Sequence, residues 1–151
     1  MKMENSNEYI SYKLNQLVVL AEDGKVGYEN AAKDVKDEAM KSSFLIFSQE
    51  RSLYAAQLRD IVYQLRGEAQ DPGGDTQGSF HRVWMDIKST FTGGDTDTII
   101  NSCITGEESA IKEFELVLND TLIPESYKMI VREQLNGIEQ ALASIKLHLH
   151  K

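Results

Sequence analysis

The chain has 151 residues, of which 41% are hydrophobic and 26% are charged, and its formal net charge is −8. These values are typical of one globular domain with a core of ordinary size, so we expect a single domain over residues 1–151. The acidic balance disfavours nucleic acid and anionic membrane surfaces as partners, and the polar start of the chain, without an apolar segment, favours a cytoplasmic protein.

The first predicted element is a long helix over residues 7–36. Apolar side chains recur there at alternating steps of four and three over residues 10–35, which is a heptad stripe. Gly24 belongs to this stripe, and Gly106 and Gly137 occupy helical positions further along. Because a glycine inside a helix costs about 1 kcal/mol relative to alanine, we expect these glycines to permit close helix approach. A bend beside a ligand cavity is the alternative.

The second predicted helix carries the same spacing over residues 40–65, with Asp37 as its N-cap. A cation interrupts the middle of this stripe, because Arg51 stands at a position where the spacing predicts a core residue. The stripe positions before and after it are Phe47 and Tyr54. The connection to the first helix is short, so the two helices are expected to form an antiparallel hairpin.

The pattern breaks after the second helix. Glycines and Pro72 in the segment RGEAQDPGGDTQGS predict a loop. The segment FHRVWMDIKSTF, residues 80–91, predicts a short amphipathic helix across the bundle, with Trp84 as a lid or, alternatively, a ligand platform. A connection of about 30 residues suits a crossover between helices that run the same way.

Two more long helices are predicted after this crossover. One covers residues 96–119, with Asp95 or Asp97 as its N-cap, and the other begins with Pro124 at its first position and extends to about Leu149. The sequence therefore predicts an all-α, ferritin-like four-helix bundle. It consists of two antiparallel helical hairpins joined by a long crossover that contains a short helix.

A carboxylate interrupts the apolar face of the third long helix at Glu107. Cys103, the single cysteine, lies on that face and is expected to be a small core residue rather than a reactive thiol. An unpaired ion in a core is costly, whereas a paired one is tolerated. We therefore hypothesise a core ion pair between Arg51 and Glu107, with a hydrogen bond from Tyr28 or Tyr54. The alternative is that both charges reach solvent at the edge of the bundle.

The whole chain resembles a bacterial family of ferritin-like four-helix proteins of uncharacterised function. The segments that carry this resemblance are LAEDGKVGYENAAKDVKD, FLIFSQERSLYAAQL, FHRVWMDIKSTFTGGD and GEESAIKEFELVL. More distantly, the chain resembles rubrerythrins and other di-iron carboxylate proteins. This resemblance implies where metal ligands would stand: one Glu on the first and on the third helix, and Glu-x-x-His on the second and on the fourth.

The chain departs from that ligand pattern. The third helix has its carboxylate, Glu107, but the second helix has Arg51 and Tyr54 in place of Glu and His. On the first helix Ala21 stands at the expected position with Glu22 beside it, and on the fourth helix the nearest match is Glu139. The histidines lie elsewhere, in the predicted crossover helix and at the C-terminal end: His81, His148 and His150.

These departures lead us to expect no metal, no other cofactor and no catalytic residues. The expected function is that of a non-enzymatic, soluble interaction or stress-associated protein that forms a homo-oligomer, such as a homodimer, without nucleic-acid or membrane partners. One alternative is a residual metal-dependent oxidase or peroxidase built on Glu107, Glu139 and Glu22. The other is a bundle whose interior or crossover helix binds a small apolar ligand.

Overall fold

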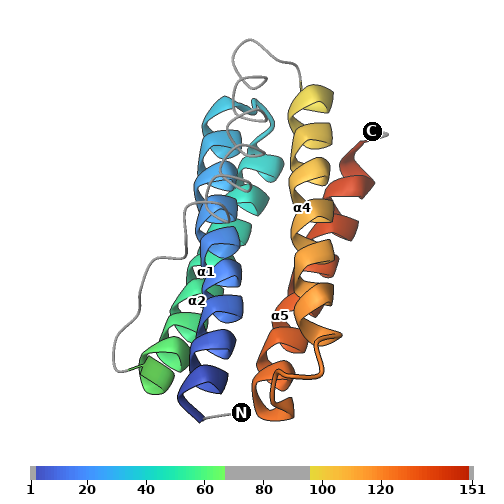
Figure 1. The fold of residues 1–151 in the computed structure, drawn as a ribbon. Helices are drawn as coiled ribbons and strands as arrows, with labels where there is room; N and C mark the ends of the chain where they lie inside the picture. The colour runs from blue at the N-terminus through green and yellow to red at the C-terminus, as the bar shows by residue number, and fades with distance from the viewer. Residues whose placement is uncertain (1–2, 67–95, 150–151) are drawn as a thin grey trace.

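A computed structural model describes residues 3–66 and 96–149 of the chain, and these residues form four α-helices without any strand (Figure 1). The helices are α1 (Met3–Asp34), α2 (Glu38–Arg66), α4 (Thr96–Leu118) and α5 (Glu125–His148). The predicted all-α class and its four long helices are confirmed, with bounds that differ by a few residues. The predicted crossover helix, with Trp84 and His81, lies outside the described residues, as does His150.

The four helices pack side by side as a bundle. α1 packs against α2 and α4, and α5 packs against α4 and α2. Along the chain α1 and α5 run upward in Figure 1, whereas α2 and α4 run downward. The two helices that run in the same direction, α2 and α4, therefore face each other across the diagonal of the bundle.

The ends of the helices follow ordinary capping chemistry, with two corrections to the sequence predictions. The N–H of Met40 donates a hydrogen bond of 3.0 Å to Oδ1 of Asp37, which confirms the predicted N-cap of α2. Asp97 lies inside the first turn of α4 and is not its N-cap, and Asp95 lies outside the described residues. Pro124 is the N-cap of α5 rather than its first residue, because its extended ψ of 146° precedes the helix.

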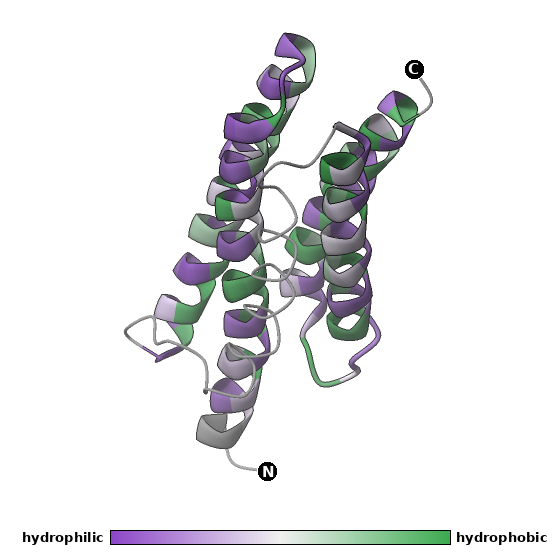
Figure 2. Ribbon diagram, turned by 90° about the horizontal axis from the view of Figure 1, so that it is seen from above, coloured by the Kyte–Doolittle hydropathy of each residue, from purple (hydrophilic) through white to green (hydrophobic). Residues whose placement is uncertain are grey.

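The core consists of two apolar clusters that follow each other along the bundle axis. The first gathers the N-terminal half of α1 with the C-terminal half of α2, and the second gathers the other ends of these helices. Hydrophobic and hydrophilic residues alternate along each helix, as the heptad stripes require (Figure 2). On α2 the stripe is displaced: Ser48 and Ala55 are fully buried, whereas Phe47 and Tyr54, which the heptad spacing predicted, are only half-buried at its edge.

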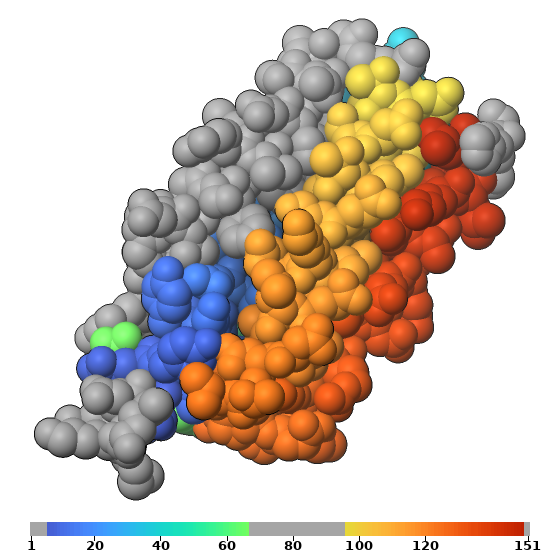
Figure 3. Space-filling model, turned by 45° about the vertical axis from the view of Figure 1, so that its right-hand side comes forward, coloured from blue at the N-terminus to red at the C-terminus, as the bar shows by residue number. Residues whose placement is uncertain are grey.

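A polar contact ties the start of α1 to the turn between α4 and α5. The hydroxyl of Tyr9 donates to Oδ2 of Asp120, and the N–H of Leu122 donates to Oδ1 at 2.9 Å. Figure 3 shows the beginning of α1 lying against the end of α4. The hydrogen bond from Tyr9 lowers the pKa of Asp120 from its ordinary value, although partial burial acts in the opposite direction.

This contact predicts a pH dependence of stability. Because the pKa of Asp120 is lower in the folded chain than in the unfolded chain, its contribution is fully present above about pH 4 and is lost as the pH falls through the folded value. We expect Tyr9→Phe to lower the free energy of unfolding, measured in urea, at about pH 6, and to lower it less at about pH 3. Tyr63→Phe, at an exposed tyrosine, is the control and should show no such difference.

Candidate functional site

The middle of the bundle contains an ion pair across its diagonal. Nη2 of Arg51, on α2, pairs with Oε1 of Glu107, on α4. The side chains of these residues are 3% and 0% exposed, so solvent does not screen the two charges. The pair lies between the two apolar clusters, because Arg51 falls between Phe44 and Ala55 on α2.

The neighbouring titratable groups of the second cluster do not carry charge. Burial raises the pKa of Tyr28 well above its usual value, and it raises the pKa of Cys103 to about 12. Burial also lowers the pKa of Arg51, but a guanidinium remains protonated in proteins. The structure places the carboxylate of Glu107 against the guanidinium of Arg51, and Glu50 on α2 is a further negative charge that acts on the pKa of Arg51.

Aromatic rings close one side of the ion pair. Cζ of Arg51 lies 5.7 Å from the ring centroid of Tyr28, within the range of a cation–π contact. The Tyr28 ring is held in turn by Phe44, at a centroid distance of 5.7 Å, and by Phe47, at 5.4 Å. The ring face of Tyr28 therefore contacts the pair. The hydrogen bond expected from Tyr28 or Tyr54 stays a prediction.

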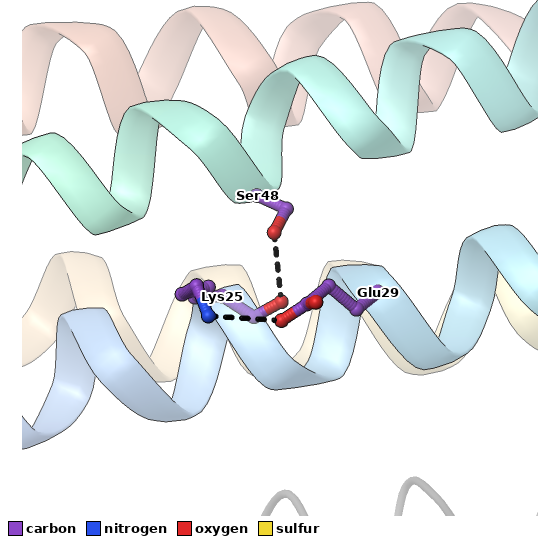
Figure 4. A network of polar contacts seen from close by, with 3 residues as sticks. All are labelled: Lys25, Glu29 and Ser48. Carbon is purple, nitrogen blue, oxygen red and sulfur yellow. Dashed lines mark hydrogen bonds and ion pairs between the residues drawn. The ribbon is translucent and has the colours of Figure 1, made fainter.

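Gly24 on α1 makes room for the guanidinium. A Cβ atom added at Gly24 would lie 3.4 Å from Cζ of Arg51 and closer still to its Nη1. One turn before Arg51, the hydroxyl of Ser48 donates to the carbonyl of Lys25 at 3.1 Å, beside the Lys25–Glu29 ion pair at 3.2 Å (Figure 4). Small side chains at this point let α1 and α2 approach closely, and this closeness positions Arg51 over the α1 backbone.

Tyr54 belongs to the contact between α2 and α5. A Cβ atom added at Gly137 would lie 3.1 Å from Cζ of Tyr54 and closer still to its hydroxyl oxygen. Nε2 of Gln134 donates to the carbonyl of Tyr54 at 3.3 Å and to Oε1 of Gln57 at 2.9 Å. At Gly24 and Gly137 the space of a Cβ atom is therefore taken by a side chain of a neighbouring helix, that of Arg51 and that of Tyr54. The close helix approach expected at these two glycines and at Gly106 stays a prediction.

The heptad stripes did not indicate that the polar residues Ser48 and Gln134 are buried. Their exposed fractions are 5% and 1%. Ser48 could have been found from its spacing, because it lies four residues after Phe44 and three before Arg51, on the face that α2 buries. Gln134 directly precedes Leu135 of the fourth stripe and gave no signal of its own.

The carboxylates proposed for a residual metal site do not come together. Glu107 is paired with Arg51 in the core, whereas Glu22 pairs with Arg59 at a half-exposed edge of α1 and α2. Glu139 is exposed on the outer face of α5. Over residues 3–66 and 96–149, no group of three or more His, Cys, Asp or Glu residues could hold a metal ion.

A di-iron centre does not fit this donor set. The site would require two carboxylate–imidazole pairs on α2 and α5, and α2 presents a guanidinium at the first of these positions. That guanidinium already forms an ion pair with the carboxylate of Glu107. The arrangement holds two opposite charges together in the core, and it leaves no open set of ligands for a metal cation.

Comparison with known proteins assigns a family over most of the chain. Residues 9–120 match the family described as Domain of unknown function (DUF2383). The match includes both Arg51 and Glu107 and ends before α5. No curated protein matches the chain. None of the helices in the described part is long and apolar enough to cross a membrane.

Proposed function

The chain belongs to the family described as Domain of unknown function (DUF2383), and from this premise we propose a function on the basis of its core. We propose a ferritin-like bundle protein, one domain over residues 1–151, that lacks a complete di-iron site and acts as a non-enzymatic interaction protein. The observation that carries this proposal is the buried Arg51–Glu107 pair. The guanidinium of Arg51 supplies a positive charge at the middle of the bundle, where the di-iron proteins that the chain resembles bind their metal ions.

The directions of the helices support the ferritin-like topology. α2 ends at the opposite end of the bundle from the start of α4 (Figure 1). A chain that connects them must return along the length of the bundle, about 43 Å for the 29 residues of α2. The intervening residues 67–95 can span that distance at about 3.3 Å per residue. These facts favour a crossover between two hairpins.

Electrostatics supports the absence of metal chemistry. A divalent cation at the centre would stand beside the fixed positive charge of Arg51, with which it would compete for Glu107. Removing Arg51 from this contact would leave a buried guanidinium unpaired, which costs several kcal/mol (about 3–5). Metal binding would have to exceed that cost without histidine ligands on α2.

Elemental analysis tests this proposal. The purified chain, expressed with excess iron and manganese, is expected to contain no stoichiometric metal, and either ion is expected to leave the thermal midpoint unchanged, since only a ligand of the native state raises it. The control is the double variant Arg51→Glu/Tyr54→His, which removes the guanidinium and introduces the Glu-x-x-His pair. It should bind more metal than the wild type. Two irons per wild-type chain would overturn the proposal.

A further inference from the structure

The outward face of α2 carries a long strip without charge. From residue 42 to residue 57, every exposed residue of α2 is uncharged. We call these residues the α2 strip: Ser42, Leu45, Ile46, Gln49, Ser52, Leu53, Ala56 and Gln57. Its large apolar side chains are well exposed, with Leu45 at 46%, Ile46 at 54% and Leu53 at 56%. The strip extends over about 22 Å at the rise of an α-helix.

The other outward faces of the bundle differ from the α2 strip. Exposed positions of α4 include Glu108, Lys112 and Glu115, and those of α5 include Arg132 and Glu133. A chain with a net charge of −8 repels a second copy of itself over most approaches. Repulsion is smallest where two faces without charge meet, and among the described helices α2 has the most exposed residues in a run without an exposed charge, the eight of the α2 strip.

Charged residues border the α2 strip. Arg59 pairs with Glu22 of α1, and Nζ of Lys41 lies 3.9 Å from Oε1 of Glu38. Asp60 is exposed beyond one end of the strip, and Glu50 is half-buried beside it, so the uncharged part of the face ends at these residues. An uncharged apolar face is the best chemical match for the α2 strip, and a second α2 strip supplies one.

We propose that the α2 strip is the surface through which two copies of this chain form an antiparallel homodimer. The two-fold axis would pass near Gln49, the residue at the middle of the strip. Reversal about this point places Ile46 opposite the partner's Leu53, and Leu53 opposite the partner's Ile46, because both lie on the same side of Gln49 around the helix. Ser52 and Ala56 are small and let the two helix backbones approach.

The size of the α2 strip limits the strength of the dimer. One pair of helices over this length buries less than the roughly 800 Å² per partner of a standard stable interface. We therefore expect a dissociation constant in the micromolar range, about 1–100 µM. This inference rests on the proposed interaction function and names its partner, a second copy of the chain.

A charge substitution tests the surface. In light scattering after size exclusion, the wild-type chain should be dimeric at several hundred micromolar, Leu53→Glu should be monomeric there, and Leu116→Glu on α4 should remain dimeric. Leu53 and Leu116 are matched, at 56% and 57% exposed, and circular dichroism checks that both variants are folded. A monomeric wild-type chain, or a dimer that Leu53→Glu leaves intact, would contradict the proposal. A dimer abolished by Leu116→Glu would contradict it equally.

Disulfide trapping tests the position of the two-fold axis. In the proposed dimer Gln49→Cys places two thiols near the axis and should give a covalent dimer on mild oxidation. Ala56→Cys lies on the same strip but about 20 Å from its mate, beyond the roughly 7 Å that a disulfide allows between Cα atoms, and should stay monomeric on a denaturing gel. The native Cys103 is buried and does not contribute. Cross-linking of Ala56→Cys in preference to Gln49→Cys would refute this geometry.

The two proposals fail independently. A monomeric wild-type chain would remove the dimer and leave the elemental analysis unchanged. Two bound irons per chain would remove the proposed function, whatever the mass measured by light scattering.

Discussion

Arg51→Ala is expected to lower the free energy of unfolding by about 3–5 kcal/mol, because it leaves the Glu107 carboxylate buried without its counter-charge. Equilibrium unfolding in urea, followed by circular dichroism, measures the change. The matched control is Arg59→Ala. Arg59 lies on the same helix and pairs with Glu22 of α1, but the two side chains are 46% and 41% exposed. Such exposed pairs contribute about 0–1 kcal/mol, so the control should change stability by no more than that.

A double substitution separates the cost of an unpaired charge from the net value of the pair. Arg51→Met/Glu107→Leu removes both charges and fills the space with apolar side chains. Replacing a buried ion pair in this way is often neutral or stabilising by about 1–4 kcal/mol, so the double variant should be at least as stable as Glu107→Leu alone and more stable than Arg51→Ala. A loss below about 1 kcal/mol in Arg51→Ala would instead indicate that water reaches the pair.

Gly24→Ala is the second large effect that we expect. Alanine favours a helix over glycine by about 1 kcal/mol, but the added Cβ would overlap the guanidinium that the ion pair holds in place. Overpacking of a core typically costs about 1–3 kcal/mol. We therefore expect Gly24→Ala to destabilise the wild-type chain, measured by the same urea unfolding.

The effect of Gly24→Ala on stability should change sign in a chain that lacks the ion pair. In the Arg51→Met/Glu107→Leu chain the rigid guanidinium is gone and a flexible methionine can move aside. Gly24→Ala should then stabilise the chain by the helix preference of alanine, about 0.5–1 kcal/mol. Equal effects of Gly24→Ala in both backgrounds would show that the glycine and the arginine are not coupled.

Most of the fold was accessible from heptad spacing, because each of the four helices buries one continuous stripe. The same spacing singled out Arg51 and Glu107, since a charge on an apolar stripe needs a partner and the two stripes offered one of each sign. Heptad spacing did not show whether Arg51 and Glu107 lie on neighbouring helices or on helices across the diagonal of the bundle. That depends on the distances between the helix axes, which a local sequence pattern does not encode.

The displacement of the stripe on α2 was not predicted, because Phe47 and Ser48 both lie at helical spacing from Arg51 and the spacing alone does not choose between them. Heptad spacing favoured Phe47 and Tyr54 as core residues, yet the smaller Ser48 and Ala55 occupy the centre of the buried face. Close packing against α1 explains this, because the nearest approach of two helices excludes large side chains and moves them to the flanks. The residues that depart from the di-iron ligand pattern, in contrast, could be identified from residue type alone, because Arg51 and Tyr54 stand where that pattern has Glu and His.

The central charges also bear on which alignments of the helices the chain can adopt. Two uniform apolar seams could slide past each other by one turn, about 5.4 Å, with little change in buried area. If α4 slipped by one turn, Cys103 or Ala110 would lie opposite Arg51 in place of Glu107. Both charges would then be buried among apolar side chains without a partner. We therefore expect the central ion pair to favour one alignment of α4 against α2 over its one-turn alternatives.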